Sequence, residues 1–310
     1  MELRQLRYFV AITEERSFTR AARKLGVAQP ALSQQLRALE LELGVKLLQR
    51  SNRTGDLTDA GVSLLARATR ILGEVRDTAD EMADHAGARR GVVRIGCALQ
   101  TLMECELPTL LSSLRASHPR IRIVLREMHT RQVLHRLDSG KVDLGLVHLA
   151  RHGSEPLVGT ERVSDQLVLR QMYREPLVLI VGPKHRLARE ARVAFATLRE
   201  EAWIAFGVGA TVRRVVELAA ETRGFVPRIA FTSTNIGTVR ALVSAGLGIA
   251  VVPRSALDVP SPPLHAVQIV KPKLERVVTL ARNPARYESH AVATVSARLV
   301  ESLGPTRSRR

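Results

Sequence analysis

The spacing of apolar residues at the start of the chain predicts three short amphipathic helices. The first carries large apolar side chains three and four positions apart, at Leu3, Leu6, Phe9 and Val10. Ser17 is a good N-cap for a second helix over residues 18–25, and Gly26 suits the tight turn that ends it. A third helix begins at Pro30, since the N–H that proline lacks would have no partner in a first helical turn.

The third helix has two different faces. Its apolar stripe consists of Leu32, Leu36, Leu39 and Leu43. Its polar stripe consists of Gln29, Ser33 and Arg37, flanked by Pro30 and Gln34. Two short helices joined by a glycine turn are typical of a helix-turn-helix, and these polar groups can bind base edges in a major groove. The periodicity alone also fits an ordinary helical pair with a solvated face.

A long helix is predicted from about Asp59 to Ala86. Apolar residues in it follow spacings of three and four, at Leu65, Ala68, Leu72, Val75, Ala79, Met82 and Ala86. Such a narrow and sustained seam favours a two-stranded coiled coil over a helix that lies on its own domain. At about 1.5 Å per residue the rod is roughly 42 Å long. Gly87 ends it, and a short hinge follows at residues 89–91.

Beyond residue 91 the pattern alternates between strands and helices. Strands are predicted at 92–97, 121–126, 142–147, 177–181, 228–232, 249–252 and 277–282. Helices are predicted at 103–117, 131–139, 211–223, 236–245 and 286–303. This order predicts an α/β fold with parallel strands and helices on the faces of the sheet.

Composition and charge narrow the class of protein. The chain has 310 residues, enough for about two domains, and only two cysteines, which excludes a disulfide-built secreted fold. No apolar run is long enough for a signal peptide or a membrane span, so we expect a soluble cytoplasmic protein. The net charge of +17 favours an anionic partner, but most of the excess lies after residue 90 rather than in the predicted helix-turn-helix.

The first sixty residues closely resemble the winged helix-turn-helix of the LysR-type transcriptional regulators. The matching pieces are Leu6–Phe9, Ser17–Thr19, Ala21–Ala22, Leu25, Gln29–Ser33, Leu39–Glu40, Leu43–Gly44, Leu47, Arg50, Arg53, Leu57–Thr58 and Ala60–Gly61. The sequence departs from the family pattern at Ala28, where serine is common, and at Gln34, Leu48 and Asp56.

The resemblance assigns DNA contacts to both parts of this region. Residues of the helix-turn-helix would contact base edges or the nearby backbone: Thr19, Gln29, Pro30, Ser33, Gln34 and Arg37. Wing residues Arg50, Asn52 and Arg53 would bind phosphates or the minor groove. The long helix would pair two chains through Leu65, Leu72, Val75 and Met82, giving a homodimer or a homotetramer on a double-stranded DNA operator.

The rest of the chain resembles the effector domain of the same family, a periplasmic-binding-protein-like fold of two α/β lobes. Matching strings include Gly140–Leu144, Gly224–Pro227 and Leu242–Gly248. The resemblance implies a DNA-binding domain at 1–58, a linker helix at 59–87, and an effector domain at 91–303 before a basic tail at 304–310. Lobe one would comprise 91–161 and 268–303, and lobe two 162–267.

Ligands of open α/β sheets bind beyond the carboxyl ends of the strands. The predicted effector-binding residues are Leu99, Gln100, Thr101, His129, Thr130, Thr211, Thr232 and Thr234. Thr101 and Thr130 match hydroxyl-bearing positions that commonly contact effector in the family. A helix N-terminus directed at the cleft favours an anionic ligand, and His129 either adds to that charge or is an ordinary loop histidine.

The sequence offers no set of residues for catalysis, a metal ion or a cofactor. His148 and His152 lack the glutamate of a zinc-protease helix and are expected on the surface. Cys97 and Cys105 lie outside any zinc motif. A buried Cys97 and an inert, helical Cys105 are favoured over a redox switch. No dinucleotide fingerprint or nucleophile motif occurs.

We therefore expect a bacterial transcriptional regulator rather than an enzyme, whose DNA binding responds to a small, anionic effector. The alternative is a small-molecule-binding protein that has lost specific DNA binding.

Overall fold

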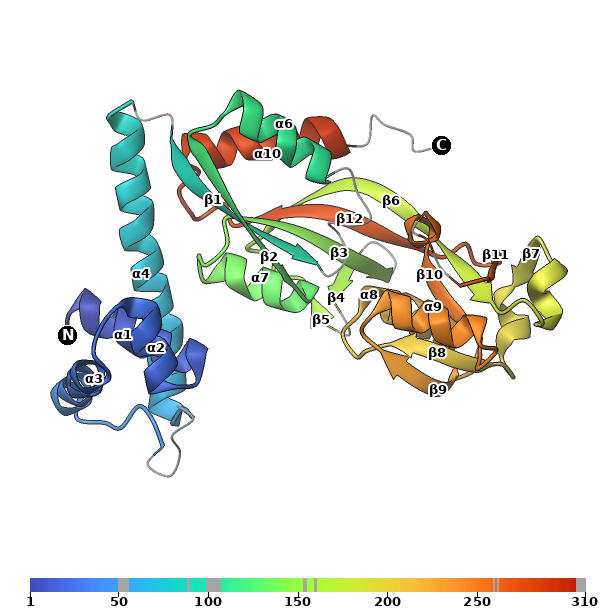
Figure 1. The fold of residues 1–310 in the computed structure, drawn as a ribbon, viewed down its shortest axis with the longest axis horizontal. Helices are drawn as coiled ribbons and strands as arrows, with labels where there is room; N and C mark the ends of the chain where they lie inside the picture. The colour runs from blue at the N-terminus through green and yellow to red at the C-terminus, as the bar shows by residue number, and fades with distance from the viewer. Residues whose placement is uncertain are drawn as a thin grey trace. The chain divides into compact units, whose positions relative to one another are not determined.

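A computed structural model describes residues 1–49, 56–87, 90–98, 107–152, 155–158, 161–258, 260 and 262–304. The chain divides into two compact units, one formed mainly by residues 1–88 and the other mainly by residues 89–310 (Figure 1). Each unit is described separately below.

The first unit begins with three helices around one core. α1 (Leu3–Glu15), α2 (Phe18–Leu25) and α3 (Gln29–Leu43) bury Phe9, Ile12 and three leucines of the apolar stripe of α3, Leu32, Leu36 and Leu39. Leu43, the last residue of the predicted stripe, is exposed at the end of the helix. The Ser17 hydroxyl caps α2 by accepting a hydrogen bond from the Arg20 N–H, and Gly26 ends the helix in the left-handed region at φ 67°. The predicted helix-turn-helix is therefore confirmed, with α3 as its second helix.

A short antiparallel hairpin follows α3. Leu48 bridges to Leu57, and the Gln49 N–H donates to the Asp56 carbonyl at 2.9 Å. Glu40, buried at the base of this hairpin, accepts hydrogen bonds from the N–H groups of Leu47 (2.8 Å) and Leu48 (3.4 Å). Burial alone would raise the pKa of the Glu40 carboxyl, but these N–H groups and the Lys46 ammonium outweigh it and lower that pKa. The ionised carboxylate thus fixes where the wing leaves α3.

α4 (Asp59–His85) is the predicted long helix, capped at its start by the Thr58 hydroxyl. Its first turns pack on α1, where Ala68 is fully buried against Leu6 and Val10, with Leu65 and Leu72 partly buried beside them. Further along, Val75 and Met82 are 41% and 54% exposed. The predicted seam therefore serves two purposes: its first half holds the helix to its own chain, and its second half is free to pair.

The second unit is built on one large mixed sheet. Its strands are β1 (Gly91–Ala98), β2 (Ile121–Met128), β3 (Leu144–His152), β4 (Glu155–Val158), β5 (Glu161–Arg162), β6 (Val168–Val181), β7 (Arg192–Ala194), β10 (Ala250–Pro253), β11 (His265–Val270) and β12 (Glu275–Arg282). The main order is β2-β1-β3-β12-β6-β11-β7. β1 pairs in parallel with β2 and β3, whereas β12 runs antiparallel to both β3 and β6.

Helices cover both faces of the first part of this sheet, which we call lobe one. α6 (Leu107–Ser117) and α10 (His290–Leu303) lie side by side on one face, and α7 (Thr130–Asp138) covers the other (Figure 1). The two resulting cores are separate. One includes Val93, Ile95 and Leu114, and the other includes Val133 and Val147. Strands that are buried on both faces read as continuous apolar runs, which is why the sequence predicted β1 and β3.

Lobe two forms around the second half of β6. β10 and β11 pair with β6, while β8 (Ala202–Phe206) and β9 (Arg228–Ser233) form a separate parallel pair. α8 (Thr211–Glu221), α9 (Ile236–Ser244) and three 3-10 turns, at Arg186–Arg189, Phe195–Leu198 and Arg254–Leu257, complete the lobe. Its core includes Phe195, Trp203 and the C-terminal end of β6. β6 and β12 are the strands that connect the two lobes (Figure 1).

No helix in the described ranges is both long and apolar enough to span a membrane.

Candidate nucleic-acid interface and ligand cleft

The polar stripe of α3 lies on the surface of the first unit. Gln29, Pro30, Gln34 and Arg37 are exposed and Ser33 is half-buried, whereas the opposite face contributes Leu32, Leu36 and Leu39 to the core. The Thr19 hydroxyl of α2 donates to the Gln29 side-chain oxygen at 3.2 Å. The structure therefore brings all six predicted helix-turn-helix contact residues to one surface. We call this set the DNA-reading surface.

The start of α3 has no side-chain cap. Ala28 occupies the N-cap position with extended backbone angles, and it offers no oxygen to the N–H groups of the first turn. These N–H groups lie beside Gln29 and Pro30. They are available to an anion such as a DNA phosphate.

The predicted wing contacts Arg50, Asn52 and Arg53 lie outside the described residues. The base of the hairpin that would carry them is described and is held by the Leu48–Leu57 bridge.

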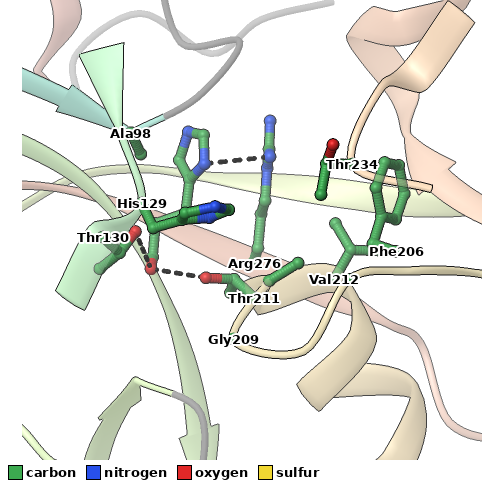
Figure 2. Close-up of a pocket in the computed structure, with 12 residues that line it drawn as sticks. Ala98, His129, Thr130, Phe206, Gly209, Thr211, Val212, Thr234 and Arg276 are labelled. Carbon is green, nitrogen blue, oxygen red and sulfur yellow. Dashed lines mark hydrogen bonds between the residues drawn. The ribbon is translucent and has the colours of Figure 1, made fainter. Parts of the chain in front are cut away.

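A ligand cleft lies in the second unit between lobes one and two. Ala98, His129 and Thr130 face it from lobe one, and Phe206, Val212 and Thr234 face it from lobe two, with Arg276 between the two groups (Figure 2). The other lining residues are His148, Gly207, Gly209, Ala210 and Thr211. The space among them is about 540 Å³, counted out to the open solvent. The cleft thus has the mixed apolar and polar lining of a small-molecule site.

One backbone carbonyl joins the two lobes at the floor of this cleft. The His148 carbonyl accepts a hydrogen bond from the Thr211 hydroxyl at 2.8 Å and from the Thr130 hydroxyl at 3.4 Å (Figure 2). Thr130 begins α7 in lobe one, and Thr211 begins α8 in lobe two. Both hydroxyls are buried. Because His148 and Thr130 both belong to lobe one, a change in the angle between the lobes must alter the Thr211 bond.

A buried ionic cluster lies beside that carbonyl. Arg276 is 3% exposed and donates from Nε (2.8 Å) and from a terminal nitrogen (2.6 Å) to the same oxygen of Glu175, itself 5% exposed. Its other terminal nitrogen lies 3.1 Å from His148 Nδ1. The second Glu175 oxygen accepts from the backbone N–H and the hydroxyl of Ser255. Glu175 therefore compensates the charge of Arg276.

This cluster fixes the charge state of His148. A guanidinium only donates, so Nδ1 of His148 must accept, and the ring proton lies on Nε2. Burial, and then the positive charge of Arg276, lower the pKa of His148 well below its ordinary value. His148 is thus a neutral, buried residue, and the expectation that it lies on the surface is wrong. Surface exposure was inferred from the absence of a metal motif, which does not bear on burial.

The N-terminus of α8 supplies hydrogen-bond donors to the cleft. Ala210 is its N-cap and provides no side-chain cap. The first N–H groups of a helix have no intrahelical acceptor, and they carry the positive end of the helix dipole. Gly207 allows the chain to approach Thr234, because an added Cβ would lie 3.1 Å from the Thr234 methyl group. Since Glu175 neutralises Arg276, these N–H groups are the main attraction for an anion.

The predicted effector-binding residues fall into three groups. His129, Thr130, Thr211 and Thr234 line the cleft. Leu99, Gln100 and Thr101 lie outside the described residues. Thr232 is exposed inside β9 and is not among the described residues of the lining, because the cleft begins only beyond the end of that strand.

Sequence reasoning missed Arg276 and His148. Each interrupts an apolar strand, at LERVVTL and LGLVHLA, and a polar residue inside such a run is a signal of a buried polar site. Cys97 is fully buried in β1, and Cys105 lies outside the described residues. Across the described residues, no three or more His, Cys, Asp or Glu side chains gather as a metal site would require.

A helix-turn-helix unit followed by a two-lobed unit with a ligand cleft defines a class of protein, the ligand-responsive DNA-binding regulators. Two family profiles identify the family. Residues 3–62 match "Bacterial regulatory helix-turn-helix protein, lysR family", and residues 86–304 match "LysR substrate binding domain". The chain belongs to the LysR family of transcriptional regulators.

Similar proteins span nearly the whole chain. It is 32% identical over 301 residues to the hydrogen peroxide-inducible genes activator of Dickeya chrysanthemi, covering 94% of both chains. It is 34% identical over 257 residues to the uncharacterized HTH-type transcriptional regulator YnfL of Escherichia coli, covering 82% of this chain and 83% of that one.

Among solved structures, full-length CbnR in complex with its target DNA matches with a TM-score of 0.66 and 26% identity. That match covers 98% of this chain and 99% of CbnR. The fold of both units is therefore that of full-length regulators of this family.

Proposed function

We propose that this regulator binds a specific DNA site through its DNA-reading surface and that a small anionic effector in the interlobe cleft controls that binding. The protein acts in the cytoplasm, where its DNA is found, and has no catalytic role. The observation that carries the DNA assignment is the exposed polar stripe of α3 opposite its buried leucines. It is supported by the similar chain CbnR, whose structure is described as a complex with target DNA.

Within the DNA-reading surface the side chains have different roles. Gln29, Ser33 and Gln34 contact base edges through amide and hydroxyl groups, which specifies the sequence. Arg37, the uncapped first turn of α3, and the wing residues Arg50, Asn52 and Arg53 bind the backbone, which positions the protein. Thr19 orients Gln29 through their hydrogen bond.

The linker helix pairs two chains. Val75 and Met82 are exposed apolar residues on its second half and are the main contacts, with Leu65 and Leu72 contributing the surface that α1 leaves uncovered. A dimer places two DNA-reading surfaces on one DNA with two-fold symmetry, so its half-sites are separated by a whole number of helical turns. Two such dimers form the tetramer.

The effector is a small carboxylate or another oxyanion. Its charged group is held by the N–H groups at the start of α8, and Thr234 and His129 contact it from either side of the cleft. Effector binding changes the lobe angle through the hydrogen bond from Thr211 of lobe two to the His148 carbonyl of lobe one. The protein then shifts between shapes that bend DNA differently. The domain boundaries that go with these roles are 1–58 for DNA binding, 59–87 for pairing and 91–303 for effector binding.

The DNA assignment is tested with the Gln29→Ala variant and the DNA upstream of the regulator's own gene. Binding is measured by gel shift on that DNA and on a set of single-base variants of the site. Gln29→Ala should lose about 1–3 kcal/mol of discrimination at one base position and retain binding to the backbone. The free energy of unfolding should not change, because Gln29 is exposed.

Gln35→Ala is the matched control. Gln35 carries the same amide on α3 but lies half-buried outside the polar stripe. Equal losses in both variants would contradict the assignment of the stripe. Absence of any specific complex, with or without added carboxylates, would contradict DNA regulation itself.

A further inference from the structure

A second concave surface of the two-lobed unit runs along the later turns of α8. The ligand cleft uses the first turn of this helix, at Thr211 and Val212, whereas this groove uses residues 215–223. Its other walls are Arg151 of β3, Arg174 of β6, residues 272–274 and the start of β12. The groove and the cleft have no lining residue in common. The space among its walls is about 1200 Å³, counted out to the open solvent.

The floor of this groove, which we call the hinge groove, is apolar. Val215, Ala219, Leu274 and Val277 are buried side chains of its lining, and Leu218 is half-buried beside them. Four of these side chains are already covered by the protein, so the free energy that a ligand gains by removing the floor from water comes mainly from Leu218. A fully hydrated anion would not gain from it.

The rim of the hinge groove is cationic. Four cations line it, Arg151, Arg174, Arg223 and Lys273, against one lining carboxylate, Glu275. Arg174 forms an ion pair with Glu275, and Arg223, just beyond the end of α8, donates to the Ala219 carbonyl of that helix at 3.4 Å. Neither Arg151 nor Lys273 forms an ion pair with any described residue, and both are exposed. The groove therefore has an excess of positive charge that a bound anion would offset.

We propose that the hinge groove is a second ligand site, specific for a small organic anion that carries a carboxylate on an apolar body. The carboxylate binds Arg151 and Lys273 at the rim, and the apolar body covers Val215, Ala219 and Leu218. A DNA backbone does not match this surface, because its phosphates are hydrated and it has no apolar part to place in a concave floor. The proposal is independent of the function assigned to the cleft.

Occupation of the hinge groove would connect the two lobes. α8 belongs to lobe two, while Arg151, Arg174 and Val277 lie on the strands β3, β6 and β12 that form the sheet of lobe one. A ligand that contacts both stabilises one lobe angle over others. Because the opposite end of α8 begins in the cleft, ligands at the two sites are coupled, and each changes the affinity of the other by the same factor.

The test uses the full-length protein and benzoate as the probe, with binding measured by isothermal titration calorimetry. Because the cleft is itself proposed to take small carboxylates, the charge variants are made in the Thr234→Phe background, which fills the cleft. In that background Arg151→Gln/Lys273→Gln should bind benzoate about tenfold or more weakly than Thr234→Phe alone. The matched control is Arg189→Gln/Arg192→Gln, which removes the same two charges from exposed positions of lobe two outside the groove. The control should bind benzoate with unchanged affinity.

Two further arms locate the site and define its chemistry. Thr234→Phe fills the cleft from an exposed position, and benzoate binding that survives this change supports the hinge groove. Benzamide and inorganic phosphate lack the charge and the apolar body, respectively, and each should bind at least tenfold more weakly than benzoate. The proposal is overturned if Thr234→Phe abolishes benzoate binding, if the groove variant retains it, if both charge variants lose it equally, or if phosphate binds as tightly as benzoate. None of these outcomes bears on DNA binding by α3.

Discussion

The DNA-reading surface and the ligand cleft are built in opposite ways. The DNA-reading surface is local: its described residues fall between Thr19 and Arg37, on two consecutive helices, and most are exposed. The cleft is assembled from segments between Ala98 and Arg276, and its central groups are buried. Removal of an exposed group changes mainly what the protein binds. Removal of a buried, paired group changes first whether that part of the protein folds.

The largest effect expected from this difference is at Arg276. Arg276→Met removes the compensating charge from Glu175 and the donor from His148, both of which are buried. We expect the unfolding free energy of the two-lobed unit to fall by about 3–5 kcal/mol, measured by urea unfolding of the full chain. Gln29→Ala, in contrast, should leave that transition unchanged.

A double variant shows whether the loss comes from the uncompensated charge. Glu175→Gln/Arg276→Met leaves no buried carboxylate without a partner and should be more stable than Arg276→Met alone. If the double variant is the less stable of the two, the stability lost in Arg276→Met comes from lost packing rather than from an uncompensated charge. The contrast between the cleft, with its buried charges, and the exposed DNA-reading surface is then weakened.

A smaller effect is expected from pH, through His148. Its pKa in the folded protein lies well below the value of about 6.5 for the unfolded chain, so below pH 6.5 the unfolded chain binds a proton that the folded protein does not. The contribution of neutral His148 to the free energy of unfolding is therefore complete above pH 6.5 and is lost as the pH falls below that value. The loss between pH 7.5 and 5.5 should be about 1–2 kcal/mol.

His148→Asn separates this contribution from that of other titrating groups. The Asn oxygen can accept from Arg276 in place of Nδ1 but does not titrate, so the stability of this variant should depend less on pH over that range. The control is His265→Asn, at an exposed histidine of β11. If both variants retain the full pH dependence, His148 is not its source.

The smallest effect is expected at the start of α3. Ala28→Ser supplies the cap that α2 has at Ser17 and α3 lacks, and should stabilise the winged unit by about 1 kcal/mol. Thermal unfolding measures this gain. Ala38→Ser makes the same chemical change in the exposed interior of α3, where serine slightly lowers helix stability. A gain at both positions would rule out capping as the cause.

Much of the fold was predictable because its signals are local. The helix boundaries at Ser17, Gly26 and Asp59 follow from capping and turn chemistry, and buried strands such as β1 appear as apolar runs. The sequence predicted only Leu177–Val181 of β6, whereas the strand begins at Val168. In that first half exposed and buried side chains are mixed, so no single period marks it. β8 and β11 were missed as short strands without clear turn signals.

The two sites were predictable to different degrees for the same reason. Contact residues on α3 share one face of one helix, so periodicity places them together. Glu175 and Arg276 are 101 residues apart and meet only because β6 pairs with β12. No local pattern indicates that pairing. Thr130 and Thr211 were found from strand ends and helix starts, but their shared acceptor, the His148 carbonyl, depends on the tertiary structure.

The position of β12 inside the sheet also constrains the order in which the protein is completed on the ribosome. β12 lies between β3 and β6, and α10 packs against α6, so lobe one needs residues 275–303 to close its core. The segments of lobe two end at Val270 and those of the winged unit lie before residue 88, so both emerge earlier. During synthesis, the apolar strands in the first half of lobe one therefore stay exposed until residues 275–303 have been made. Chaperones would bind these exposed strands. Truncation near the C-terminus should destabilise lobe one, although most of that lobe is encoded before lobe two.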